Sequence, residues 1–165
     1  MIKRCKWCKD DPLMIKYHDE EWGRRVKEDR KLFEALTLEV FQAGLSWRTV
    51  LYKREQFRVR FYQFNLERVA GLTEKDVERL LQDPGIIRHR KKMEATIENA
   101  QRIVRIVESE GSFYQWMKQL PKDQEQACKI VKNQFKHVGI TTAESFIIAV
   151  GVLPTPHDEQ CFLHN

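Results

Sequence analysis

The sequence predicts an all-α protein that forms a single helical domain. Apolar residues recur at the three- and four-residue spacing of helices, and β-branched residues never alternate with polar ones over the length of a strand. A chain of 165 residues is long enough for one domain with a sizeable core but short for two. There is no internal repeat and no flexible linker, so we expect residues 1–165 to form one domain.

The composition is ordinary for a soluble globular protein, with 42% hydrophobic and 32% charged residues. No apolar run approaches the ~20 residues that a membrane-spanning helix needs, and residues 1–7 lack the apolar core of a signal peptide. We therefore expect a cytoplasmic protein with no membrane partner. The net charge of +5 fits a polyanionic partner only weakly, because clustering of charge matters more than its total.

The first long apolar stripe contains Leu32, Leu36 and Ala43 at helical spacing, and Glu39 falls within it. Burying a charged carboxylate costs free energy unless it has partners. An acid of this kind in a cleft is a functional candidate. The alternative, which the helix pattern alone favours, is a structural hydrogen bond to a neighbouring helix end or ring N–H.

Caps and chain breaks predict the elements that follow. A helix is expected from 49 to 64, and a short helix begins at Thr73, since Thr73 and Asp76 have capping-box spacing. The break at residues 83–85 precedes a long helix that ends at Gly111. The apolar face of that long helix contains Met93, Ile97, Ala100, Val104 and Val107.

Two apolar groups mark further helices before the C-terminal region. The first contains Phe113, Trp116 and Leu120 and predicts a turn or more of helix before Pro121. The second contains Ala127, Ile130, Val131 and Phe135.

A tight link of residues 136–140 follows, and we expect the next helix to begin at Thr141. Gly139 can take the positive φ that such a turn needs, and Thr141 and Glu144 again have capping-box spacing. Exposed backbone N–H groups at this helix start suit a DNA phosphate, which they would hold without reading sequence.

Residues 138–143 resemble the hairpin of helix-hairpin-helix DNA-binding proteins, with the whole motif at about 125–152. An ordinary helix–helix turn is an equal alternative on this segment alone. The densest basic cluster is residues 88–92, which includes Arg90. Its charge pattern favours a solvated helix face slightly over a phosphate contact.

Cysteines and histidines at opposite ends of the chain form a possible metal-binding set: Cys5, His18, His157 and Cys161. Two thiolates and two imidazoles suit a closed tetrahedral zinc site, which would be structural because no position stays open for water. Such a site would join the termini. Cys8 and His164 are competing ligands, and four unconnected side chains are the alternative.

Four aromatic rings lie near Glu39 or close to the N-terminus: Trp7, Tyr17, Trp22 and Trp47. Aromatic residues more often form core than binding site, and we expect some of these to be core. Two facing rings can nevertheless sandwich a flipped base. A ring face also favours a cationic ligand over a neutral one.

Several segments closely resemble the 3-methyladenine DNA glycosylase I family. They are Asp11-Pro12-Leu13, Tyr17-His18-Asp19, Glu21-Trp22-Gly23, Gln42-Ala43-Gly44-Leu45-Ser46-Trp47 and Gly85-Ile86-Ile87-Arg88-His89-Arg90. The resemblance is dense from residue 4 to residue 92 and returns weakly from 135 to 161. The sequence departs from the family at Val40, where glycine is common, and at Glu144, where an aromatic residue is usual.

The resemblance implies a helix-hairpin-helix fold and an enzyme that removes 3-methyladenine from DNA to leave an abasic site. Its partner would be duplex DNA with alkylated bases, bound by a monomer that joins the nucleoid when engaged. N3-methylation makes the base cationic and weakens the glycosidic bond, so little acid catalysis is needed. No lysine nucleophile is required, and we expect no strand cleavage.

Carried over by position, the resemblance implies a role for each candidate residue. Glu39 would hydrogen-bond the methylated base and Trp47 would stack on it. The remaining implied pocket residues are Tyr17, Trp22 and, at the wall, Trp7. The implied ligands of one structural Zn²⁺ per chain are Cys5, His18, His157 and Cys161.

Two rival hypotheses remain. Most helix-hairpin-helix glycosylases use an aspartate beyond the second hairpin helix as their main catalytic acid, and Asp158 lies in roughly that region. Its place between His157 and Cys161 suits a structural role better. Alternatively, the chain is a damage-sensing DNA-binding protein that flips bases without releasing them.

Overall fold

The computed structural model describes residues 1–164, which form helices and loops with no β-strand in that range. The longer helices are α1 (Pro12–Glu20), α2 (Asp29–Gln42), α7 (Arg90–Glu110), α9 (Gln124–Gln134) and α10 (Ile140–Ala149). The shorter elements are η1 (Lys6–Cys8), α3 (Trp47–Tyr52), α4 (Arg54–Arg60), η2 (Tyr62–Phe64), α5 (Leu66–Ala70), α6 (Glu74–Leu80) and α8 (Phe113–Lys118). The predicted all-α class is confirmed.

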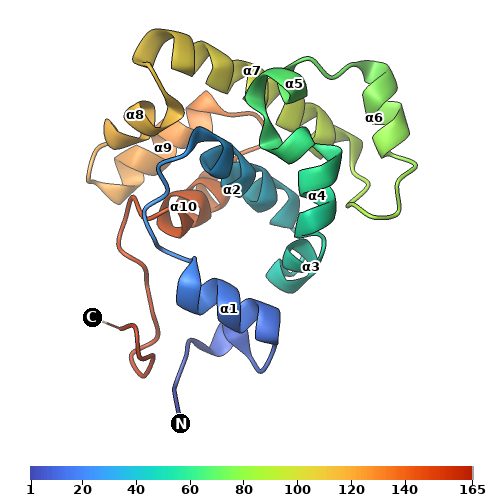
Figure 1. The fold of residues 1–165 in the computed structure, drawn as a ribbon. Helices are drawn as coiled ribbons and strands as arrows, with labels where there is room; N and C mark the ends of the chain where they lie inside the picture. The colour runs from blue at the N-terminus through green and yellow to red at the C-terminus, as the bar shows by residue number, and fades with distance from the viewer. Residues whose placement is uncertain (165) are drawn as a thin grey trace.

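Helix α2 runs through the middle of the molecule and packs against α7, α8 and α10. In Figure 1, α7 lies above it, α3 to α6 lie to the right, and α8 to α10 lie to the left. Helix α1 and both ends of the chain form the lower part, where the Phe162 N–H donates to the Lys3 carbonyl over 2.8 Å. The two ends of the sequence therefore lie side by side.

The continuous helix predicted from 49 to 64 is wrong. The segment forms α3, α4 and η2, and the residues of η2 have positive φ values of 53°, 56° and 57°. The break lets Phe57, Phe61 and Phe64 all enter the core, with successive ring centroids 6.0 Å apart. Tertiary packing of these rings overrides the helical pattern.

The cap predictions hold at two helix ends. Thr73 and Asp76 form the expected capping box at the start of α6, and Gly111 ends α7 with φ at 95°. The predicted apolar face of α9 is wrong at Ile130, whose side chain is exposed.

The hairpin differs from its prediction in three ways. Helix α10 begins at Ile140 rather than Thr141, and its N-cap Gly139 has φ at −87°. The positive φ of the link falls on His137, at 61°. Thr141 and Glu144 form no capping box, and no side chain within residues 1–164 caps α10. The first N–H groups of α10 are therefore left without a side-chain acceptor.

Candidate functional site

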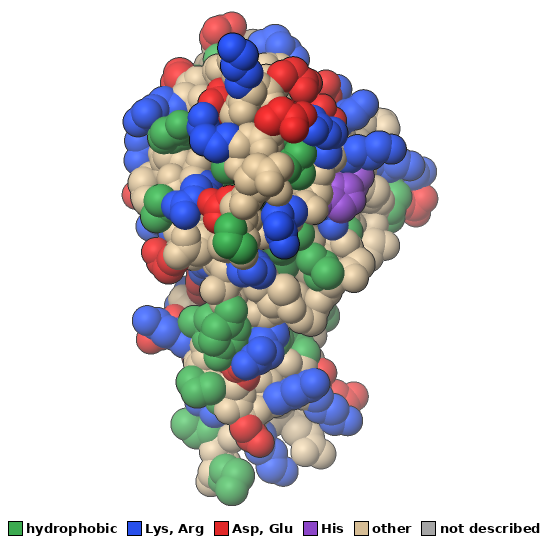
Figure 2. Space-filling view, turned by 90° about the vertical axis from the view of Figure 1, so that its right-hand side faces the viewer, with side chains coloured by type: hydrophobic (Ala, Val, Ile, Leu, Met, Phe, Trp, Pro, Cys, Tyr) green, Lys and Arg blue, Asp and Glu red, His purple; other side chains and the backbone are tan. Residues whose placement is uncertain are grey.

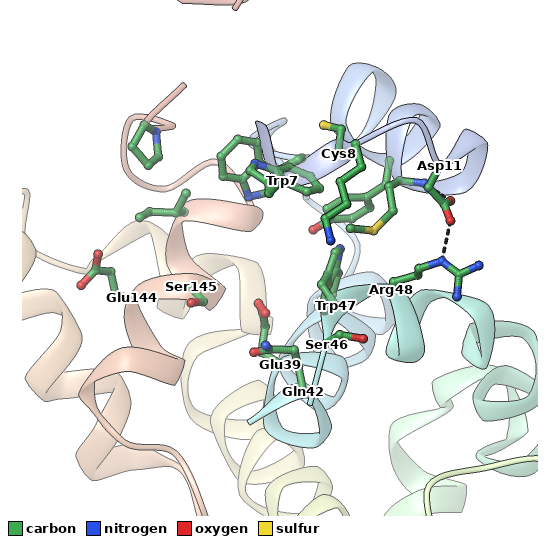
Figure 3. A pocket seen from close by; sticks show the side chains of 16 residues that line it. Trp7, Cys8, Asp11, Glu39, Gln42, Ser46, Trp47, Arg48, Glu144 and Ser145 are labelled. Atoms are coloured by element: carbon green, nitrogen blue, oxygen red, sulfur yellow. Dashed lines mark hydrogen bonds and ion pairs between the residues drawn. The ribbon is translucent and has the colours of Figure 1, made fainter. Parts of the chain in front are cut away.

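A cavity of about 650 Å³ opens between η1, α1, α2, α3 and α10. Figure 3 shows Glu39 of α2 between Trp47 of α3 and Ser145 of α10, with Trp7 on the other side of the opening. The structure brings together all five residues expected at a base pocket: Trp7, Tyr17, Trp22, Glu39 and Trp47.

The four rings form a connected wall in which no two neighbours are parallel. Trp47 lies 5.2 Å from Tyr17 at 56°, Tyr17 lies 6.3 Å from Trp7 at 63°, and Trp7 lies 5.2 Å from Trp22 at 83°. All four are partly buried rather than core residues. Each ring therefore keeps part of its surface accessible, and all four line the cavity.

Glu39 is buried, with 7% of its surface exposed, and its carboxylate has no hydrogen-bond partner within residues 1–164. Burial raises the pKa of this carboxyl from its ordinary value to about 8. The structural hydrogen bond that the helix pattern favoured is therefore wrong. The Nε1–H of Trp47, which also lines the cavity, is likewise buried without a partner among the described residues.

A second glutamate on α2 shows the ordinary solution to burial. Glu34 is 5% exposed, and its carboxylate accepts hydrogen bonds from Arg54 at 2.9 Å and Arg58 at 3.1 Å. Burial alone would raise the pKa of Glu34, but the Arg58 and Arg54 bonds and charges hold it below its ordinary value. Glu39 lies on the same helix without such partners among the described residues, which makes it a candidate ligand-binding group.

The two departures from the family pattern lie in different places. Val40 is 1% exposed and packs into the core, so it does not crowd the cavity. Glu144 lines the cavity, and Figure 3 shows it on the far side of Ser145 from Glu39.

Sequence reasoning missed several polar residues of the cavity, among them Lys9, Gln42, Arg48 and Ser145. The sequence held a signal for two of them: Arg48 follows Trp47 directly, and Gln42 follows Glu39 by three residues on the same helix.

The metal-binding set also comes together. The ligand atoms of Cys5, His18, His157 and Cys161 all lie within 4.8 Å of one another. Sulfur-to-nitrogen distances are 3.4 Å for Cys5–His157, 3.5 Å for Cys161–His18 and 3.6 Å for Cys161–His157. Ordinary zinc–ligand bonds at tetrahedral angles place sulfur and nitrogen about 3.5 Å apart. These four residues can hold a metal ion that joins the two ends of the chain.

Neighbouring groups orient the ligands. The Nδ1 atom of His18 lies 2.8 Å from Oδ1 of Asp19, which leaves Nε2 facing Cys161. Arg4 holds Asp19 through Nε and Nη2. The Cys5 sulfur accepts the Asp158 N–H at 3.3 Å. A carboxylate behind a histidine and N–H donors to sulfur are the usual supports of metal ligands.

The competing candidates take other places. Cys8 and His164 are not members of the cluster, and burial raises the pKa of the Cys8 thiol to about 12. Asp158 accepts the Lys6 N–H at 2.7 Å and does not line the cavity of Glu39. Its carboxylate therefore joins the loop between His157 and Cys161 to the start of η1.

Positive charge is dispersed over the face that Figure 2 shows. Figure 2 shows Lys and Arg side chains spread over both parts of one face, with acidic side chains among them. Arg90 forms ion pairs with Glu78 and Glu74. Gly139 and Thr141 are exposed at the hairpin. No helix of the described chain is long and apolar enough to cross a membrane.

Comparison with known proteins agrees with this geometry. The family model for methyladenine glycosylase matches residues 7–130. The chain is 40% identical to DNA-3-methyladenine glycosylase 1 of Escherichia coli (strain K12), over 92% of each chain. A crystal structure of 3-methyladenine DNA glycosylase I superposes with a TM-score of 0.87, at 41% identity, over 99% of this chain and 100% of that one.

A second solved structure concerns 3-methyladenine recognition by the Staphylococcus aureus enzyme. It superposes with a TM-score of 0.86, at 33% identity, over 98% of both chains. Family model, overall sequence and overall fold thus agree. The chain belongs to the methyladenine glycosylase family.

Proposed function

We propose that this protein is a monofunctional DNA glycosylase of base excision repair. It hydrolyses the N-glycosidic bond of 3-methyladenine in alkylated duplex DNA and leaves an abasic site. The observation that carries the proposal is the buried, unpartnered carboxylate of Glu39 beside four aromatic rings. Relatives of the same length and fold are 3-methyladenine glycosylases.

The proposed roles follow from the charge of the lesion. The pKa of Glu39 near 8 keeps its carboxyl mostly neutral in the empty pocket at pH 7. A cationic base stabilises the ionised carboxylate, so binding the lesion creates the ion pair. A neutral base forms no such ion pair with Glu39, so it binds without this stabilisation. Trp47 stacks on the flipped base, and Tyr17, Trp22 and Trp7 complete the pocket and add ring faces that favour a cation.

The bond changes need few protein groups. When the glycosidic C–N bond breaks, its electron pair moves onto the methylated base and neutralises the positive charge. Water then forms the new bond to the sugar carbon and loses a proton to solvent. Glu39 and the rings hold and orient the base. Water is the nucleophile, and the proposal gives Lys9 at the cavity no covalent role, so strand cleavage does not follow.

The metal in the four-residue cluster is proposed to be one structural Zn²⁺. Two cysteines and two histidines are the donor set that zinc prefers, and their spacing fits a closed tetrahedron. When bound, zinc supplies stability rather than chemistry, since the four protein ligands leave no open position. Cys5 and His18 would then hold the N-terminal segment to His157 and Cys161.

The proposed DNA contacts are non-specific. Helices α9 and α10 and their link form the helix-hairpin-helix motif, at about residues 125–152 of a single glycosylase domain. The uncapped N–H groups near Gly139 and Thr141 suit a phosphate. Arg90 stays a candidate phosphate contact, although it would first have to exchange its ion pairs. We propose a monomer that works in the cytoplasm on the nucleoid.

A second candidate function is a damage sensor that flips bases without releasing them. The presence of Glu144 near the pocket favours it, because the resemblance places an aromatic residue there. The alternative with Asp158 as catalytic acid is weaker, since that carboxylate is bonded to the Lys6 N–H outside the cavity.

The test is base release from methylated duplex DNA, with the freed bases identified by chromatography. Release of 3-methyladenine while 7-methylguanine remains supports the proposal. DNA binding without any release supports the sensor. Asp158→Asn separates the remaining rival: base release survives under our proposal and is lost if Asp158 is the acid.

A further inference from the structure

A buried lysine on α7 holds the end of the helix that carries Glu39. Lys92 is only 6% exposed, and its Nζ donates to the carbonyls of Phe41 at 3.1 Å and Ala43 at 2.7 Å. Lysine is almost never buried unless it is paired. An ammonium group also matches the negative end of the α2 dipole. Lys92, a member of the cluster expected to be a solvated face, therefore fixes the start of the loop that leads to Trp47.

An asparagine on the same helix holds the hairpin. Asn99 is 2% exposed; its Nδ2 donates to the Lys136 carbonyl at 3.1 Å, and its Oδ1 accepts the Lys136 N–H at 2.7 Å. Asn99 follows Lys92 by seven residues, which places both on one side of α7. Arg102 adds a third bond, from Nη1 to the Gln134 carbonyl at 2.8 Å.

These contacts lie behind two opposite walls of the cavity. The loop anchored by Lys92 ends at Ser46 and Trp47, which line the cavity. The hairpin anchored by Asn99 begins α10, which contributes Ser145 to the other wall. A single helix thus sets the separation between the base-stacking wall and the hairpin.

We propose that Lys92 and Asn99 are positioning residues for base delivery: they hold the Trp47 loop and the hairpin at one fixed separation, so that a duplex resting on the hairpin presents its flipped base to the pocket. The inference rests on the proposed function. It assigns no chemistry to either side chain, because both act through the backbone they bind.

The two residues have different expected signatures. Lys92→Met releases the Trp47 loop, so affinity falls for free 3-methyladenine and for duplex DNA alike. Asn99→Leu releases only the hairpin, so duplex affinity falls while affinity for the free base is kept. Loss of the paired bonds predicts a decrease of about tenfold in each affected affinity. For Asn99→Leu, KM rises and kcat at saturating DNA is unchanged.

The experiment measures two dissociation constants for each variant. Free 3-methyladenine is followed by tryptophan fluorescence, and a duplex with an abasic-site analogue is followed by anisotropy, at a temperature where circular dichroism shows every variant folded. Thr96→Val is the matched control, because Thr96 is 1% exposed on α7 but bonds only the Lys92 carbonyl of its own helix. The control keeps both affinities, and Lys92→Arg, which retains charge and donors, recovers most of the loss.

Three results would overturn the inference: wild-type duplex affinity in Asn99→Leu, equal loss of both affinities in Asn99→Leu, or the same loss in Thr96→Val. If Lys92→Met does not fold, Asn99→Leu and its control still decide. Failure of the proposed function is a different result, in which the wild-type protein releases no 3-methyladenine even though the affinities of the variants separate as expected.

Discussion

At the scale of single residues, the contrast between Glu34 and Glu39 carries most of the functional argument. Both are buried on α2, yet only Glu34 is paired with arginines. The sequence placed Glu39 in an apolar stripe, but the stripe could not show whether another side chain lies within hydrogen-bond distance of its carboxylate. That information depends on which side chains of α3, α4 and α10 reach the carboxylate, and helix periodicity does not contain it.

The raised pKa of Glu39 makes stability depend on pH. Its folded pKa, about 8, lies above the ordinary value of 4.5. Between these values the folded protein holds a proton that the unfolded chain has lost, so the free energy of unfolding falls as pH rises through that window. Glu39→Gln removes this pH-dependent loss. The free energy of unfolding of the variant, relative to that of wild type, therefore rises by roughly 3–5 kcal/mol from pH 5 to pH 9. Denaturant unfolding at both pH values measures it, and parallel pH dependences would contradict the assignment.

Val40 gives a second residue-scale prediction, because its side chain packs in the core rather than the cavity. Val40→Gly restores the residue common in the family but leaves a void in the core and a glycine within α2. We expect the free energy of unfolding to fall by roughly 2–4 kcal/mol, with the rate of base release by folded protein unchanged. Thermal unfolding and single-turnover release measure the two effects. A faster release would show that Val40 does obstruct the pocket.

At the scale of elements, local sequence signals predicted where helices end, but they did not predict the helix breaks that tertiary packing causes. The capping box at Thr73 and the helix end at Gly111 each depend on a few neighbouring residues, and both are confirmed. The break at η2 depends on three phenylalanines that reach a common core, so no local rule reveals it. The hairpin turn has the same difficulty, since His137 takes the positive φ in a link that Asn99 holds at Lys136.

The turn after α10 shows how one glycine joins two elements. Gly151 has φ at +81°, and a Cβ there would lie 2.7 Å from the backbone nitrogen of Arg25. The segment beside it is held by bonds from the Gly23 and Val26 N–H groups to the end of α10. A side chain at residue 151 would therefore force α10 and this segment apart.

Gly151→Ala tests that junction against Gly111→Ala. Both positions have positive φ, but a Cβ at Gly111 meets nothing within 4 Å. Backbone strain alone predicts a cost of about 1 kcal/mol at Gly111. We expect a clearly larger loss at Gly151, because backbone atoms must also move. Chemical denaturation of both variants gives the comparison, and equal losses would mean that the segment yields without cost.

At the scale of the whole molecule, the cluster of Cys5, His18, His157 and Cys161 closes the chain on itself. The sequence named its four members but not their proximity, since more than a hundred residues separate His18 from His157. Helices α2 and α10 pack together and bring the two ends to one place. The cavity lies next to this junction, with Trp7 and Trp22 contacting His18 or His157 as well as lining the pocket.

Removal of the proposed zinc is therefore expected to loosen the N-terminal wall of the pocket. Cys161→Ser should hold less than the wild-type content of about one zinc per chain and unfold at lower temperature, because structural zinc binding contributes on the order of 10 kcal/mol in small domains. Any remaining folded protein should still release base. Metal analysis and thermal unfolding measure the effect, with Cys128→Ser as a control at a buried cysteine outside the cluster. Equal zinc contents in both variants would refute the site.

The most direct test of the central claim compares 3-methyladenine release by wild type and Glu39→Gln, in single turnover at saturating protein. Glutamine keeps the shape of the side chain but cannot become an anion. We predict a loss of about a hundredfold or more in the rate of release, with duplex affinity unchanged. Release at the wild-type rate by Glu39→Gln would show that the buried carboxylate does not select or hold the cationic base.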